Sequence, residues 1–401
     1  MNMTVLFDLD DTLLSNNMDT FLSAYLKAIS ASIPAVPQGQ FIQTLLFASQ
    51  KMTENMNPAL ALEEVFDQHF YPGIGIPRAD INEDLNAFYR DRYPALRTVT
   101  QPRPQAVAAV QHAFQRGWQV VVPTNPLFPQ TATHQRLAWA GLSAADYPFA
   151  LVTTYEAFHF AKPNPAYCAE ILGQLGCPEG PVVMVGNSLE DDLLPAAVLG
   201  IPGYWVTEDG TPVPAELPDG SAAGSLAGLI PWLEARSAES FTPQLDTPAA
   251  LLAWLRAAPA AVAALTQPLS PAAWAQRPAA EEWSLTEILA HLRDVDLDVN
   301  LPRFQKLAAE SNPFLPGVDT DSWAEQRGYR QQNGPECLRQ FVQARIQLIQ
   351  HLSNLPAEAW QQTARHAIFG PTTLQELVRF IITHDRSHLQ QISDTLRQIQ
   401  A

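Results

Sequence analysis

The pattern of apolar and polar positions differs between the two halves of the chain. Residues 5–7 form a short apolar run that ends in acidic residues, and this pattern predicts a buried strand. Residues 118–122 and 182–185 predict two further buried strands. An amphipathic helix that begins at Pro104 precedes the strand at residues 118–122. Strands separated by helical segments indicate an α/β domain, which we expect to end with a closing helix near residue 236.

The segment between the first two strands has helical rather than strand periodicity. Apolar residues recur at spacings of three and four over residues 18–95. We expect a helical insertion here, covering about residues 15–98. Residues 200–205 predict a last short strand, and residues 207–247 carry turn signals that indicate turns and a linker apart from one short helix.

The second half predicts helices throughout. A capping box opens at Ser284, with Glu287 three residues later, and apolar residues follow at helical spacing. The other three helices are expected over residues 249–265, 336–355 and 372–399. Four main helices with short or medium connections indicate an all-α four-helix bundle.

Charge and length support the same division. The chain has 401 residues, enough for at least two cores. Residues 1–246 hold 11 Lys+Arg and 26 Asp+Glu, while residues 247–401 hold 13 and 15. We therefore expect a first domain over residues 1–236, a linker over 237–246 and a second domain over 247–401.

Composition also limits the partners and the location. A net charge of −17 argues against nucleic acid and against an anionic membrane surface. The three cysteines have no metal-ligand spacing and indicate reduced packing residues. No signal peptide or long apolar run is evident, so we expect a cytoplasmic protein that does not enter a membrane. The oligomeric state stays open.

Candidate chemistry lies where the predicted strands end. Asp8 and Asp10 are two residues apart and share one side of the chain, so they could hold Mg²⁺ while one attacks an electrophile and the other moves a proton. Thr124 could donate to a phosphoryl oxygen or simply cap a helix. Lys162, one of four lysines, could neutralise a phosphate or could be a solvated charge.

Four ordered motifs resemble those of the haloacid dehalogenase (HAD) superfamily. They are Asp8-Leu9-Asp10-Asp11-Thr12, then Thr124-Asn125, then Lys162, then the acidic stretch Gly186–Asp192. The resemblance implies a Rossmann-like domain in which the helical insertion is a cap that selects the substrate. It also implies that Asp8 is the nucleophile, that Asp10 is the acid and base, and that Thr124, Asn125 and Lys162 bind the phosphoryl group.

The fourth motif departs from the superfamily pattern. Asn187 stands where the pattern has an aspartate, so the Mg²⁺ site is expected from Asp8 and Asp10 with Asn187, Asp191 or Asp192 as further oxygen ligands. The presence of Asp10 disfavours dehalogenation, which the resemblance links to lineages without this second acid.

Three histidines stand out in the predicted bundle. His384 and His388 are four residues apart on one helix face, and His291 lies in the helix capped by Ser284. Such a set could bind a transition metal, although packed or solvated histidines are the more common reading of the bare pattern. The flanking residues 282–292 and 384–392 resemble the metal-binding helices of the DinB superfamily, which implies a three-His site for Zn²⁺, Ni²⁺ or Fe²⁺.

Together these expectations describe a Mg²⁺-dependent phosphatase of a small phosphate ester, fused to a metal-binding bundle. Phosphoryl transfer by a mutase is the enzymatic alternative. A metal-carrying binding or sensor protein with weak phosphatase activity is the second alternative. The DinB resemblance also allows a thiol-dependent transferase.

Overall fold

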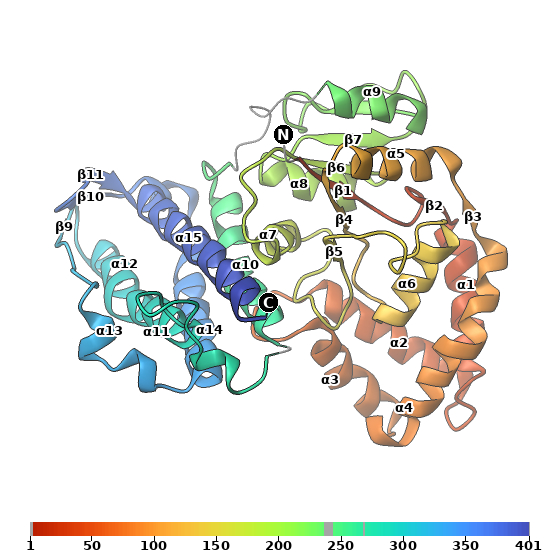
Figure 1. Ribbon diagram of the computed structural model, residues 1–401, viewed down its shortest axis with the longest axis horizontal. Coiled ribbons are helices and arrows are strands. Elements are labelled where there is room, and N and C mark those ends of the chain that lie inside the picture. The colour runs from red at the N-terminus through yellow and green to blue at the C-terminus, as the bar shows by residue number, and fades with distance from the viewer. Residues whose placement is uncertain (1–2, 236–243, 268, 401) are drawn as a thin grey trace. The chain divides into compact units, whose positions relative to one another are not determined.

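The computed structural model describes residues 3–235, 244–267 and 269–400. It divides into two compact units, each described by itself (Figure 1). The first comprises residues 1–56, 60–167 and 179–243, and the second comprises residues 57–59, 168–178 and 244–401. Most of the linker expected over residues 237–246 lies outside the described residues, so the domain limits stay predictions.

The first unit is built on a six-stranded parallel sheet with the order β5-β4-β1-β6-β7-β8. All four residues of β1 are buried, as expected of a central strand covered on both faces. The strands are β1 (Thr4–Phe7), β4 (Gln119–Val122), β5 (Leu151–Val152), β6 (Val182–Gly186), β7 (Gly203–Val206) and β8 (Ala222–Gly224). The α/β fold class is therefore confirmed.

A helical cap is inserted between two very short strands. β2 (Leu14–Ser15) pairs antiparallel with β3 (Gln101–Pro102), so the insertion leaves and rejoins the sheet domain at one place. Its helices gather on one side of the sheet (Figure 1). They are α1 (Met18–Ser30), α2 (Gln38–Thr53), α3 (Leu62–Ile74) and α4 (Arg78–Ala87), followed by a π-helical turn Phe88–Arg92 and a 3-10 segment Tyr93–Val99.

The remaining helices of the first half follow the strands. They are α5 (Pro104–Gln115), α6 (Gln130–Trp139), α7 (Pro165–Gln174), α8 (Leu194–Val198) and α9 (Leu229–Glu234), with a π-helical turn Leu189–Leu193 and a 3-10 turn Leu226–Gly228. Strand β8 lies inside the segment where the sequence indicated only turns and a linker. That expectation was wrong because Ala222–Gly224 are small residues without the β-branched signal of a strand.

The second unit contains the helices expected from sequence. The capping box at Ser284 is present: the Glu287 carboxylate accepts a hydrogen bond from the Ser284 backbone amide at 2.9 Å. The helices are α10 (Pro248–Thr266), α11 (Leu285–Val295), α12 (Leu301–Ala309), α13 (Trp323–Gln326), α14 (Gly334–Ser353) and α15 (Leu374–Gln400). A π-helical turn Asp296–Asn300 joins α11 to α12, and 3-10 turns lie at Ala273–Ala275, Tyr329–Gln331 and Ala357–Gln361.

The sequence led us to expect helices throughout the second unit, but the structure also contains strands there. A small sheet with the order β11-β10-β9 contains β9 (Phe314–Leu315), β10 (Thr363–His366) and β11 (Gly370–Thr373). Thr372 therefore belongs to a strand, and α15 begins two residues later. The hairpin turn uses Gly370 with a φ of 73°, a left-handed conformation that glycine adopts without strain.

Helix α10 bears on the expected absence of a membrane segment. By length and composition alone it is long and apolar enough to cross a membrane, which the sequence reading had missed. Within the structure, 67% of its apolar window is buried, as in the core helix of a bundle. One such helix is weak evidence for a span.

A buried ion-pair network lies inside the bundle. Arg345 on α14 is almost completely buried and pairs with Asp296 at 2.7 Å and with Asp385 at 2.5 Å. Buried charges of this kind are tolerated only when each has a partner, because a buried ion without one has lost its hydration. Arg345 thereby links the π-helical turn to α15.

We predict that Arg345→Met destabilises the bundle by about 3–5 kcal/mol, because two buried carboxylates lose their shared cation. The matched control is Arg339→Met, which removes an exposed ion pair on the same helix and should cause no measurable change. Urea unfolding of the full chain, followed by hydrogen exchange at the amides of α14, measures both. Recovery in the triple variant Arg345→Met, Asp296→Asn, Asp385→Asn is expected, and equal stability of the two single variants would contradict the prediction.

Candidate functional site

Three neighbouring parallel strands bring the first candidate site together. β1 lies between β4 and β6, so residues that follow these strands meet at one edge of the sheet. Asp8 follows β1, Thr124 lies just beyond β4, and Asn187 follows β6. The predicted residues thus lie where an open α/β sheet places its ligands.

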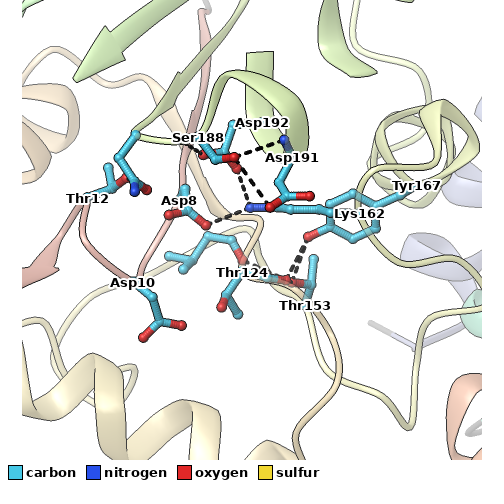
Figure 2. Close-up of polar contacts among 12 residues, drawn as sticks. Asp8, Asp10, Thr12, Thr124, Thr153, Lys162, Tyr167, Ser188, Asp191 and Asp192 are labelled. Atoms are coloured by element: carbon cyan, nitrogen blue, oxygen red, sulfur yellow. Dashed lines mark hydrogen bonds and ion pairs between the residues drawn. The ribbon is translucent and has the colours of Figure 1, made fainter. Parts of the chain in front are cut away.

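Lys162 occupies the centre of this site (Figure 2). Its Nζ lies 2.6 Å from Oδ1 of Asp8 and 2.5 Å from Oδ1 of Asp192, and all three side chains are buried. Burial, together with the charge of Asp192, raises the pKa of Asp8 to about 7, while Lys162 opposes that rise. The two carboxylates hold the pKa of Lys162 well above its usual range. The lysine is therefore a buried cation, not a solvated one.

The carboxylate of Asp10 points away from this cluster (Figure 2). Its Oδ2 pairs with Arg136, and its Oδ1 accepts a hydrogen bond from Asn16 at 2.9 Å. Arg136 is 1% exposed, and its guanidinium lies 4.5 Å from the ring centre of Phe128. The sequence reading missed Arg136, because an arginine in a polar helix is normally solvated and nothing in the sequence marks this one as buried.

Thr124 is held by its backbone and keeps its hydroxyl free. The carbonyl oxygen accepts hydrogen bonds from Thr153 at 2.6 Å and from Tyr167 at 2.8 Å. Thr124 Oγ1 and Asn125 Oδ1 are buried without a hydrogen-bond partner among the described residues. Unpaired buried polar atoms are rare, so these two atoms are suited to meeting a bound ligand. Thr153 and Tyr167 carried no signal in the sequence.

The three residues of the fourth motif have different surroundings. Asn187 Oδ1 accepts a hydrogen bond from Thr12 at 3.1 Å, whereas Asp192 accepts from both Lys162 and the Ser188 backbone amide. Asp191 is exposed and lies against Ser188, the residue that caps the following π-helical turn. Only Asp192 among these three is brought into contact with Lys162.

These contacts indicate which oxygens could hold Mg²⁺. Both oxygens of Asp10 and of Asp192 are already occupied. Asp8 Oδ2, Asn187 Oδ1 and the exposed carboxylate of Asp191 are the motif oxygens that have no buried cation or amide against them in the described part of the chain. Oxygen donors of this kind fit a hard cation, with less negative charge than a set of three carboxylates would supply.

A cavity of about 450 Å³ is lined by residues of the cap and by residues near 127–131 and 155–156 of the sheet domain. Its lining is mostly apolar, with aliphatic as well as aromatic side chains, and the polar residues that reach it include Arg78 and Glu156. Phe128 lines this cavity and also contacts the guanidinium of Arg136, which pairs with Asp10. Asp10 is therefore connected to the cavity through Arg136 and Phe128. The principal aromatic lining residues are Tyr25, Phe66, Phe70, Tyr71, Tyr89, Phe128 and Tyr155.

The second candidate site is a cluster of three histidines in the bundle. His291 on α11 faces His384 and His388 on α15, and one nitrogen from each lies within 4.8 Å of the other two. Nε2 of His384 is 3.1 Å from Nε2 of His291 and 3.1 Å from Nε2 of His388. Three convergent imidazole nitrogens are a donor set that fits a transition metal such as Zn²⁺ and leaves positions open.

The surroundings keep these imidazoles in the form that binds metal. Burial, with the charge of His388 next, lowers the pKa of His291 and of His384 to about 3, so both are neutral at pH 7. Nδ1 of His388 lies 2.9 Å from the amide oxygen of Gln391. An amide oxygen only accepts, so the proton of His388 is on Nδ1 and Nε2 is free to bind a metal.

With this geometry in place, comparison with known proteins identifies both parts of the chain. Residues 3–200 match the family of haloacid dehalogenase-like hydrolases. Residues 254–392 match the DinB superfamily. The first part of the chain thus matches the haloacid dehalogenase-like hydrolases and the second the DinB superfamily, and the resemblances found in the sequence are confirmed.

Individual relatives are distant. The uncharacterized protein YuaE of Bacillus subtilis is 24% identical over 136 residues, which are 31% of this chain and 84% of YuaE. Similar solved structures include a 2-haloacid dehalogenase from Pseudomonas syringae (21% identity, 58% of this chain, 99% of that one, TM-score 0.40) and a HAD phosphatase from Thermococcus onnurineus (19%, 58%, 98%, 0.39). Another is YfiT from Bacillus subtilis, described as a probable metal-dependent hydrolase (15%, 40%, 93%, 0.36).

We predict that the full chain binds about one transition-metal ion through the three histidines. The double variant His384→Ala, His388→Ala should lose that ion, because a single imidazole remains. His351→Ala on α14 is the matched control, since this histidine is not part of the cluster. Metal content after chelation and reloading with Zn²⁺, measured by elemental analysis, checks the prediction. Equal zinc in the double variant and the control would contradict it.

Proposed function

We propose that the first domain hydrolyses a small phosphate monoester through an aspartyl-phosphate at Asp8. The observation that carries this proposal is the buried Lys162–Asp8 ion pair beside the unpartnered hydroxyl of Thr124. A cation next to a carboxylate nucleophile offsets the repulsion between that carboxylate and an incoming phosphate. A free hydroxyl beside them supplies a donor for a phosphoryl oxygen.

The chemistry assigns one role to each residue. Asp8 attacks phosphorus, the bond from phosphorus to the ester oxygen breaks, and water later cleaves the aspartyl-phosphate to release inorganic phosphate. Lys162 and the Thr124 hydroxyl hold the phosphoryl oxygens, and Asn125 is placed to assist them. Mg²⁺, when bound by Asp8, Asn187 and Asp191, would supply further positive charge to the phosphoryl group.

Asp10 can serve this reaction only if its present contacts change. Both of its oxygens accept hydrogen bonds, from Asn16 and from Arg136, so neither is available to carry a proton to the leaving oxygen. Opening of the Asp10–Arg136 pair would free the carboxylate for that step. We propose that a substrate in the cap cavity favours this opening, because Phe128 forms part of both environments.

The lining of the cap supports a class of substrate. A cavity whose wall is mostly apolar favours a leaving group with an apolar or aromatic body over a highly hydroxylated sugar. We therefore propose an aryl or similarly apolar alcohol as the leaving group. A leaving group of this kind also disfavours the alternative in which the enzyme is a mutase that transfers a phosphoryl group between positions of a sugar.

For the second domain we propose a role that uses a transition metal at His291, His384 and His388. The neutral imidazoles and their convergence support metal binding. A metal-carrying binding or sensor protein, with only weak phosphatase activity in the first domain, is the alternative function for the whole chain. Turnover by the first domain discriminates between the two proposals.

We predict that Asp8→Asn lowers the hydrolysis of aryl phosphates at least about a thousand-fold, because the amide cannot form the aspartyl-phosphate. The matched control is Asp19→Asn, an exposed acid in the first turn of α1, which should retain activity. Release of inorganic phosphate by the full chain in the presence of Mg²⁺ is the measurement.

A second assay separates the alternatives. Release of halide from a 2-haloacid, lost in Asp8→Asn and indifferent to Mg²⁺, would replace the phosphatase proposal with dehalogenation. Absence of both activities would favour the binding or sensor role.

We also predict that Asn187→Asp lowers the Mg²⁺ concentration for half-maximal activity by about tenfold, because a charged oxygen replaces a neutral one. The substitution keeps the acceptor for the Thr12 hydroxyl. Asp191→Asn should change the Mg²⁺ dependence in the opposite direction. An unchanged dependence in Asn187→Asp would show that residue 187 does not hold the ion.

A further inference from the structure

A second cavity, of about 230 Å³, lies within the bundle unit and reaches one of the clustered histidines. His384 forms part of its wall, together with residues of α12 and of the β10–β11 hairpin. The polar lining includes Asn300, Arg303 and His366. The cavity therefore offers a ligand two polar regions, one at the histidine cluster and one at Arg303 and His366.

Arg303 lacks the partner that a sheltered arginine normally has. Its guanidinium donates to the carbonyl oxygen of Pro316 at 3.2 Å, and among the described residues no carboxylate pairs with it. Burial lowers the pKa of Arg303, with no acid nearby to oppose the effect. By contrast, Arg345 in the same unit has two carboxylates. The positive charge of Arg303 is thus left uncompensated at the cavity wall.

His366 adds an unpaired donor beside this charge. Its Nδ1 accepts hydrogen bonds from the backbone amides of Ile368 at 3.2 Å and Phe369 at 3.4 Å, so the proton of the neutral ring is on Nε2. His366 is only 4% exposed, and its Nε2 has no hydrogen-bond partner in the described part of the chain. The unpartnered N–H of His366 and the uncompensated charge of Arg303 thus line the same cavity, where an acceptor with negative charge would satisfy both.

The rest of the cavity is apolar and open to solvent. Val318, Ile368, Phe369 and Phe380 all line it, and between 37% and 71% of each residue is exposed. The rings of Phe369 and Phe380 lie 4.2 Å apart, and Phe369 stacks on His366 at 4.8 Å. Large apolar side chains gathered around one opening are typical of a surface that covers a ligand.

We propose that this cavity binds a small organic carboxylate with an aromatic or aliphatic body. The carboxylate lies against Arg303 and Nε2–H of His366, the apolar body lies on Phe369 and Phe380, and the far end of the ligand reaches the metal at His384. One full positive charge and one neutral donor match a single negative charge spread over two oxygens. The last of these contacts rests on the metal role proposed above, whereas the first two do not.

The probe is 3-phenylpropanoate, titrated calorimetrically into the full chain loaded with Zn²⁺ and into the metal-free chain. Arg303→Gln should weaken binding about tenfold or more in both forms, and Arg303→Lys, which keeps the charge, should weaken it less. His366→Phe, which removes the donor and keeps a flat ring, should also weaken it. Arg330→Gln, an exposed arginine of the same unit that does not line the cavity, is the matched control and should bind as the parent does.

Two comparisons decide between the explanations. Neutral 3-phenylpropanamide should bind the parent protein at least about tenfold more weakly than the acid does. Arg303→Gln should bind the amide and the acid with equal affinity. Binding that needs Zn²⁺ but is unchanged in Arg303→Gln would overturn the proposal, because the carboxylate would then bind the metal directly. If the histidines bind no metal while the dependence on Arg303 persists, the metal role fails and the carboxylate site stands.

Discussion

The ion pairs of Lys162 with Asp8 and Asp192 are the contacts on which the first site depends. A buried ammonium group loses its hydration, and two carboxylates supply the replacement, Asp8 directly after β1 and Asp192 in the π-helical turn that follows β6. The strand order β4-β1-β6 makes this arrangement feasible, since it brings residues distant in sequence to one edge of the sheet. Fold and site are coupled here, because the buried lysine and the carboxylate of Asp8, the proposed nucleophile, each need the other.

Buried charged groups in the bundle also need partners, and they differ in whether they have them. Arg345 finds two carboxylates and becomes part of the core. The three histidines avoid the problem, because burial keeps His291 and His384 neutral and so able to bind a cation. Among the described residues no carboxylate pairs with Arg303, and Nε2 of His366 has no hydrogen-bond partner; both side chains line one cavity. An unsatisfied buried donor in a cavity wall points to a ligand.

The sequence predicted what depends on local pattern. Buried strands, the capped helix at Ser284 and the i, i+4 pair His384 and His388 follow from spacing alone, and the structure contains them. Contacts between distant segments could not be predicted in this way. Arg136 illustrates the limit, because its pairing with Asp10 depends on the position of α6 beside β2 and on no local signal. The small sheet of the bundle was missed because its strands have two to four residues.

Arg136 also changes how the two acids of the first motif are understood. Spacing placed Asp8 and Asp10 on one side of the chain, yet the structure gives them different cations, Lys162 for one and Arg136 for the other. Asp8, the proposed nucleophile, therefore lies in the strand-end site, whereas Asp10 pairs with Arg136 outside that site. Because Phe128 touches Arg136 and lines the cap cavity, occupancy of the cap can affect the contacts of Asp10 without moving Asp8. In the proposed reaction, substrate selection and proton transfer would then be linked through one buried guanidinium.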